Sequence, residues 1–88
     1  MAKREYTIRD ESGLHARPAT LIVNAASHFP NVTMALYKDG KSVNLKSILG
    51  VMSLAVGQYD SFQVEAVGAD ADKALDAVET VLLDNKLI

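Results

Sequence analysis

The sequence predicts an α+β sandwich, in which helices cover one face of a single β-sheet. Two patterns carry this prediction. Apolar and polar residues alternate in four short segments, as in half-buried strands, and two longer segments repeat apolar residues with the 3.6-residue period of a helix. The order is strand, helix, strand, strand, short helix, strand, helix. A chain of 88 residues without repeats or linkers is expected to form one domain, 1–88.

The chain is predicted to begin with a strand and a helix. Residues 6–8 (YTI) alternate, and residues 10–13 (DESG) break the pattern. The period changes at Ala16, after which apolar residues share one helix face. These residues are Ala19, Ile22, Val23, Ala26 and Phe29. Pro18 falls in the first turn, where its missing N–H costs nothing, and the helix is predicted to end at residues 30–31 (PN).

A β-hairpin is predicted next. Val32, Met34 and Leu36 alternate with another set of residues and indicate a strand; that set is Thr33, Ala35 and Tyr37. Residues 38–41 (KDGK) contain Asp-Gly, which favours a tight hairpin turn. A short second strand is expected to continue through Val43 and Leu45.

The second half of the chain predicts two helices and a strand. Ser47 is a good N-cap for a short apolar helix, and residues 62–66 alternate as a fourth strand. The last helix has a strong apolar stripe of Ala71, Ala74, Leu75, Val78, Val81 and Leu82. Asp70 and Asp72 lie at its predicted start, where acidic side chains favour the helix dipole, and Lys86 lies near its end.

Composition excludes several functional classes. The net charge of −2 and the scattered basic residues argue against direct nucleic-acid binding. The absence of cysteine excludes disulfides, thiolate metal sites and thiol nucleophiles. The N-terminal residues MAKREYTIRD are charged and contain no apolar run, so no signal peptide is expected. No apolar run approaches the roughly 18 residues that span a bilayer. A cytoplasmic protein without membrane insertion is therefore expected.

The stretch SGLHARPAT, residues 12–20, places a histidine where the first helix is predicted to begin. A helix N-terminus presents free N–H groups and partial positive charge, which suit an anion. A neutral imidazole at His15 can act as a covalent nucleophile, and Arg17 can offer a planar fork of donors to phosphoryl oxygens. The ordinary alternative is a surface or capping histidine. His28, late in the same helix, is interpreted as an ordinary surface residue.

Ser47 is the second candidate site. Its simplest role is a helix cap, but a phosphate would also be tolerated at a helix N-terminus. The short helix has more apolar residues than two turns can bury, so Leu49 and Met52 are expected to form a small exposed docking patch.

No cofactor or metal is expected. His15 and His28 lie far apart, and no i, i+4 pair with a carboxylate joins them. Residues 50–57 (GVMSLAVG) lack the Lys-Ser/Thr of a phosphate-binding loop, so nucleotide binding is not supported.

The two motifs closely resemble the HPr family, the histidine-containing phosphocarriers of the bacterial phosphoenolpyruvate:sugar phosphotransferase system. GLHARPAT resembles the family's active-site signature, and KSVNLKSILGVMSL resembles its regulatory-serine segment. The resemblance covers essentially the whole chain. It implies an open-faced β-sandwich, with four antiparallel strands in the order 1-4-2-3 covered on one face by three helices.

The resemblance also implies roles for individual residues. His15 would be phosphorylated on Nδ1 by enzyme I and discharged to enzyme IIA domains, and Arg17 matches the active-site arginine. Ser47 matches the serine phosphorylated by HPr kinase/phosphorylase, which links the family to carbon catabolite repression through catabolite control protein A. The expected docking residues are Leu49, Met52 and Thr20. The chain would be a phosphoryl carrier and not an enzyme.

The chain departs from the family pattern in a few places. The KDGK hairpin looks longer than usual, Leu49 stands where methionine is frequent, and Ala55 stands where glycine is frequent. The tail LLDNKLI lacks the common ending, so help from a C-terminal carboxylate at His15 is in doubt.

Two other functions compete with the phosphocarrier interpretation. A purely regulatory binding module would act through Ser47 and the apolar patch, but regulatory members of the family lack the active-site histidine that this chain keeps. A small RNA-binding domain would need basic or aromatic surface stripes, which the negative charge and low aromatic content do not supply.

Overall fold

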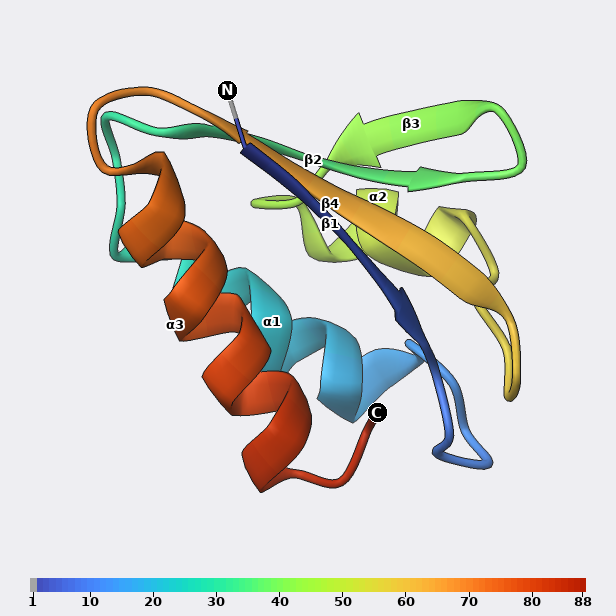
Figure 1. Ribbon diagram of the computed structural model, residues 1–88. Helices are drawn as coiled ribbons and strands as arrows, with labels where there is room; N and C mark the ends of the chain where they lie inside the picture. Colours follow the sequence, from blue (N-terminus) through green and yellow to red (C-terminus); the bar gives the residue numbers. More distant parts are fainter. Residues whose placement is uncertain (1) are drawn as a thin grey trace.

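The sheet is antiparallel, and helices cover one of its faces (Figure 1). A computed structural model describes residues 2–88, and within them the strand order is β1-β4-β2-β3. The elements are β1 (Ala2–Thr7), α1 (Ala16–Ser27), β2 (Thr33–Lys38), β3 (Lys41–Asn44), α2 (Ile48–Ser53), β4 (Ser61–Val67) and α3 (Ala71–Asp84). The predicted fold class and the strand order implied by the family resemblance are both confirmed.

Strand β4 organises the sheet because it pairs with a strand on each side. Tyr6 of β1 lies opposite Phe62, and Leu36 of β2 lies opposite Val64. Alternation places every second residue of β4 against the helices, where it is buried, and leaves the other face of the sheet open. The predicted hairpin turn is present, since Asp39 and Gly40 both have positive φ, at 51° and 79°.

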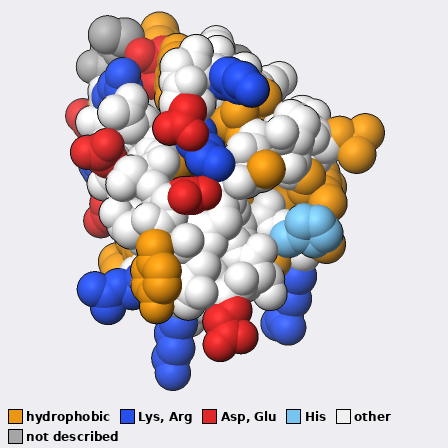
Figure 2. All heavy atoms as spheres, turned by 90° about the vertical axis from the view of Figure 1, so that its right-hand side faces the viewer, with side chains coloured by type: hydrophobic (Ala, Val, Ile, Leu, Met, Phe, Trp, Pro, Cys, Tyr) orange, Lys and Arg blue, Asp and Glu red, His pale blue; other side chains and the backbone are white. Residues whose placement is uncertain are grey.

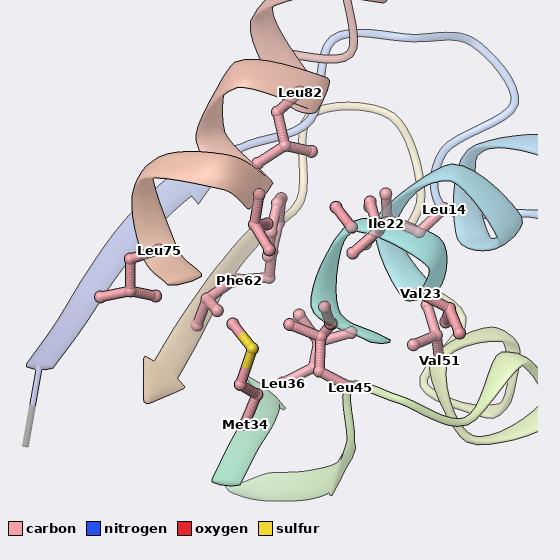
Figure 3. Packing of buried hydrophobic residues seen from close by; sticks show 14 of the residues in the cluster. Leu14, Ile22, Val23, Met34, Leu36, Leu45, Val51, Phe62, Leu75 and Leu82 are labelled. Atoms are coloured by element: carbon pink, nitrogen blue, oxygen red, sulfur yellow. The ribbon is translucent and has the colours of Figure 1, made fainter. Parts of the chain in front are cut away.

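The core lies between the sheet and the helices. Figure 3 shows side chains from α3, β4, β2 and α1 meeting in one interior, among them Leu82, Phe62, Leu36 and Ile22. The apolar stripes predicted for both long helices supply this core, since most of their members are buried. Among residues 2–88, no helix is both long and apolar enough to cross a membrane.

Several predicted boundaries were wrong. Strand β1 begins at Ala2, earlier than the predicted residue 6. The charged residues of its first half do not show a clear apolar–polar alternation, so this part was not predicted as a strand. Ile8 lies after the end of the strand and is fully buried. Helix α1 ends at Ser27, before residues 30–31, and His28 is its C-cap, so Phe29 is only partly buried. Leu45 is buried beyond the end of β3.

Lys86 lies near the end of the last helix, as predicted, just beyond its C-cap Asn85. Helix α3 ends at Asp84, and Lys86 adopts a left-handed conformation with φ of 57° beyond it. The chain therefore turns back there, and it does not place the ammonium group in the last helical turn.

A polar cluster fastens the edge strand β1 to α3. The Tyr6 hydroxyl donates to Glu79 Oε1 over 2.7 Å, and Arg4 pairs with Asp76 at 2.8 Å. Burial, reinforced by the hydrogen bond to Glu79, raises the pKa of Tyr6 to about 12.

The raised pKa of Tyr6 predicts a specific alkaline response. The folded state favours the neutral phenol, so its contribution to stability is fully present below pH 10 and is lost as the pH rises through 12. Tyr6→Phe is expected to lower the free energy of unfolding by about 1 kcal/mol at neutral pH and to remove part of the alkaline loss. Urea melts of both proteins at several pH values test this, and parallel alkaline losses would contradict it.

Candidate functional site

His15 occupies the N-cap position of α1 and is exposed to solvent. Its backbone is extended, with φ of −90° and ψ of −174°, and within the described chain its side chain makes no capping hydrogen bond. The first helical hydrogen bond runs from the Ala19 N–H to the His15 carbonyl, over 2.9 Å. The N–H groups of Ala16 and Arg17 precede this bond, so the imidazole stands beside uncapped helix donors.

The loop before His15 is held by a close backbone contact. Gly13 has φ of 62°, and a Cβ there would lie 2.2 Å from the Val56 carbonyl oxygen. Leu14 is buried, and its N–H donates to the same oxygen over 2.9 Å. Asp10 accepts from the Ser12 N–H at 2.8 Å. The histidine therefore follows a fixed loop that only glycine can form at position 13.

The segment that receives this loop carries backbone strain. Ala55 follows α2 with φ of 53°, a conformation that costs a residue with a side chain about 1–2 kcal/mol. The family resemblance marks this as a position where glycine is frequent, and the structure gives the physical reason.

Ala55→Gly is expected to raise the free energy of unfolding by about 0.5–1 kcal/mol, because glycine relieves the left-handed strain but gains freedom in the unfolded chain. Ala77→Gly, within α3, provides the opposite control and should destabilise by a similar amount. Thermal melts of both variants give the comparison. A lower Tm for Ala55→Gly would contradict the strain argument.

Arg17 lies in the first turn of α1, exposed, beside the end of the chain. It lines a shallow depression of about 200 Å³ together with Asp10, Asn85 and Leu87. The tail is anchored there, because Leu87 is buried and its carbonyl accepts the Arg9 N–H over 2.6 Å. This anchoring was not predicted from the sequence, although the apolar pair Leu87 and Ile88 indicates it.

Ser47 caps α2, as predicted. Its Oγ accepts the Gly50 N–H over 3.0 Å, and the side chain is half-buried. The adjacent Lys46 donates its Nζ to the carbonyl oxygens of Phe29 and Val32, at 2.7 and 2.5 Å. These bonds fix the start of α2 beside the end of α1.

The two motifs share the helical layer but do not touch. Helices α1 and α2 pack together, with Val23 and Val51 close to one another in Figure 3, and they run in roughly opposite directions in Figure 1. Ser47 consequently lies toward the C-terminal end of α1, whereas His15 lies at its start, next to the segment that follows α2.

The apolar surface of α2 differs in detail from the predicted patch. Leu49 is 81% exposed and Ile48 is 39% exposed, whereas Met52 is half-buried and packs against the core. The i, i+3 spacing from Leu49 predicted Met52 as its exposed neighbour, whereas the exposed neighbour is Ile48. Thr20 is half-buried, and its hydroxyl donates to the Ala16 carbonyl over 2.9 Å.

The remaining candidates add no further chemistry at these helices. His28 is exposed at the C-terminus of α1. Within residues 2–88, no group of three histidine or acidic side chains is placed to hold a metal ion. Figure 2 shows acidic and basic side chains interspersed over one face of the molecule, without a field of a single sign.

The fold and the histidine signature together define a small phosphocarrier of the open-faced sandwich class, and comparison with known proteins agrees. The family model described as "PTS HPr component phosphorylation site" matches residues 2–84. The chain belongs to the HPr family, which confirms the resemblance seen in the sequence.

Solved structures show the same relationship. The histidine-containing phosphocarrier protein of Mycoplasma is 38% identical, with a TM-score of 0.94 over 99% of this chain and 98% of that one. HPr of Thermoanaerobacter tengcongensis is 41% identical, with a TM-score of 0.89 over 98% and 94%. Crh, the catabolite repression protein of Bacillus subtilis, is 39% identical, with a TM-score of 0.73 over 96% and 95%.

Proposed function

We propose that this protein accepts a phosphoryl group from phospho-enzyme I on His15 and passes it to enzyme IIA domains of sugar permeases. The observation that carries the proposal is the exposed imidazole at the start of α1, which makes no capping hydrogen bond and follows a loop held by the Val56 carbonyl. A nucleophile that must meet several protein partners has to be accessible, and one that must transfer rapidly has to be held in place.

The proposed chemistry is a phosphoryl exchange between imidazoles. The Nδ1 lone pair of neutral His15 attacks phosphorus, a P–N bond forms, and the P–N bond to the donor histidine breaks as that ring leaves with its electron pair. The new phosphoryl oxygens would lie near the first-turn N–H groups, and Arg17, two residues after His15 on the same helix turn, would supply further donors. A helix end stabilises such an anion by about 0.3–1 kcal/mol, enough to hold the group without trapping it.

Incubation with phosphoenolpyruvate and enzyme I tests the proposal directly. Mass measurement should show one added phosphoryl group, labile to acid as a phosphoramidate is, and addition of an enzyme IIA domain should remove it. The chain acts as a protein substrate without turnover of its own and requires no cofactor. An unmodified mass, or an acid-stable adduct, would contradict the assignment.

Arg17→Lys is expected to slow transfer both to and from His15, because lysine keeps the charge but loses the bidentate fork. A loss of about tenfold corresponds to one charge-assisted hydrogen bond of about 1.4 kcal/mol. The Tm should change little, since the side chain is exposed. Rapid-quench measurement of both directions checks this, and unchanged rates would show that guanidinium geometry plays no part.

A second, regulatory function is proposed for Ser47, with HPr kinase/phosphorylase as the modifying enzyme and catabolite control protein A as a partner of the modified form. Two observations support it. Ser47 caps a helix whose next residues, Ile48 and Leu49, are exposed and apolar, so a phosphate would change a surface suited to docking. The similar protein Crh is named for catabolite repression.

A further inference from the structure

Lys38, at the end of β2, is directed into the molecule. Its Nζ donates to the Ala55 carbonyl over 3.0 Å and pairs with Asp60 Oδ2 at 3.1 Å. The same Asp60 oxygen accepts the Gly57 N–H over 2.9 Å. The Lys38 side chain is only 16% exposed, so its ammonium group is engaged by these internal acceptors. One lysine and one aspartate therefore hold both ends of residues 55–57.

Residues 55–57 in turn hold the loop that precedes His15. The Val56 carbonyl, between the two fastened ends, accepts the Leu14 N–H at 2.9 Å and lies against Gly13. Leu14 is the residue immediately before His15. A shift of the Val56 carbonyl would therefore move the backbone that carries the imidazole.

The conformation of this segment needs an external restraint. Ala55 has φ of 53°, which an alanine rarely adopts, and such conformations persist when surrounding contacts fix them. The contacts of Lys38 and Asp60 supply that restraint. The pKa of Asp60 is lowered by the Gly57 N–H and by Lys38, so the carboxylate stays ionised and paired at neutral pH.

We propose that Lys38 and Asp60 form a positioning pair for His15, acting through residues 55–57 and the Leu14 amide. This inference rests on the proposed phosphocarrier function, because its consequence is the rate of phosphoryl transfer. Neither residue touches the imidazole. Their effect is to keep its backbone where the attacking nitrogen and the first-turn donors of α1 meet one phosphoryl group.

Three variants test the transfer rate. Lys38→Met keeps the side-chain length but removes the ammonium group, and Lys38→Arg keeps a donor. Lys73→Met removes the same charge from an exposed position in the first turn of α3. With enzyme I, Lys38→Met should lower the maximal rate of phosphoryl acceptance about tenfold with an unchanged KM, since small misplacements near a reacting group slow the chemical step. Lys38→Arg should recover most of the rate, and Lys73→Met should match the parent.

Amide hydrogen exchange tests the positioning without any phosphotransfer. In Lys38→Met the Leu14 amide should exchange at least about tenfold faster, since it loses a fixed acceptor, while the Val64 amide in central β4 should keep its rate. Asp60→Asn keeps an oxygen for the Gly57 N–H, so its Leu14 amide should exchange faster than in the parent but more slowly than in Lys38→Met. This second variant also provides a test if Lys38→Met folds poorly.

The outcomes separate this inference from the function on which it rests. A parent chain that accepts no phosphoryl group contradicts the proposed function, and the Leu14 exchange then decides the positioning role by itself. The inference is overturned if Leu14 keeps its parental exchange rate in Lys38→Met and Asp60→Asn. It is also overturned if a phosphorylatable parent and Lys38→Met share the same maximal rate, or if all amides accelerate equally, which would indicate global destabilisation.

Discussion

His15→Ala is expected to abolish phosphorylation from phosphoenolpyruvate completely, while the protein keeps its fold. The imidazole is the only group at the start of α1 whose nitrogen can attack phosphorus, since the neighbouring arginine is always protonated. The fold should survive because His15 is exposed and, within residues 2–88, its ring makes no capping hydrogen bond. Mass measurement after incubation with enzyme I, together with a thermal melt, gives both readouts.

His28→Ala is the matched control, because His28 is an exposed histidine at the other end of the same helix. It should accept a phosphoryl group at the parental rate. Phosphorylation of His15→Ala, or its loss in His28→Ala, would place the acceptor elsewhere. A large fall in Tm for His15→Ala would instead show that the residue has a structural role that the contacts do not reveal.

Ser47→Asp is expected to fold normally but to accept phosphate from enzyme I at least tenfold more slowly, mainly through weaker binding. Aspartate is a good N-cap and its charge suits a helix N-terminus, so α2 should persist. The new carboxylate would stand beside the exposed Ile48 and Leu49, on the surface that we propose for docking and that would lose water on binding. Leaving one charge unpaired there costs several kcal/mol, and about 1.4 kcal/mol already gives a tenfold loss.

Ser47→Ala and Ser47→Asn separate charge from capping. Alanine removes the oxygen that accepts the Gly50 N–H, whereas asparagine keeps a capping oxygen without the charge. Both should transfer faster than Ser47→Asp, and the deficit of the aspartate variant should change with salt concentration. Equal rates for the aspartate and alanine variants at both salt concentrations would reduce Ser47 to a helix cap.

The sequence alone determined the features that depend on neighbouring residues. The alternation at residues 62–66 and the apolar stripe of α3 specify a strand and a helix wherever they occur, because the periods of 2 and 3.6 are local properties of the backbone. The Asp-Gly turn and the Ser47 cap are local for the same reason. His15 and Arg17 could be selected as candidates because the chemistry of a helix start is visible in a short motif.

The tertiary structure decided what depends on residues far apart in the chain. No local pattern shows that Val56 would accept the Leu14 N–H, or that Lys38 would reach Ala55 and Asp60. The exposure of Ile48 and the burial of Leu87 likewise follow from which surfaces the other elements cover. Such contacts depend on how the sheet and helices pack, and packing follows from the whole apolar surface and not from any short segment. The sequence thus selected His15 as the candidate acceptor, and only the fold revealed the contacts that fix the loop before it.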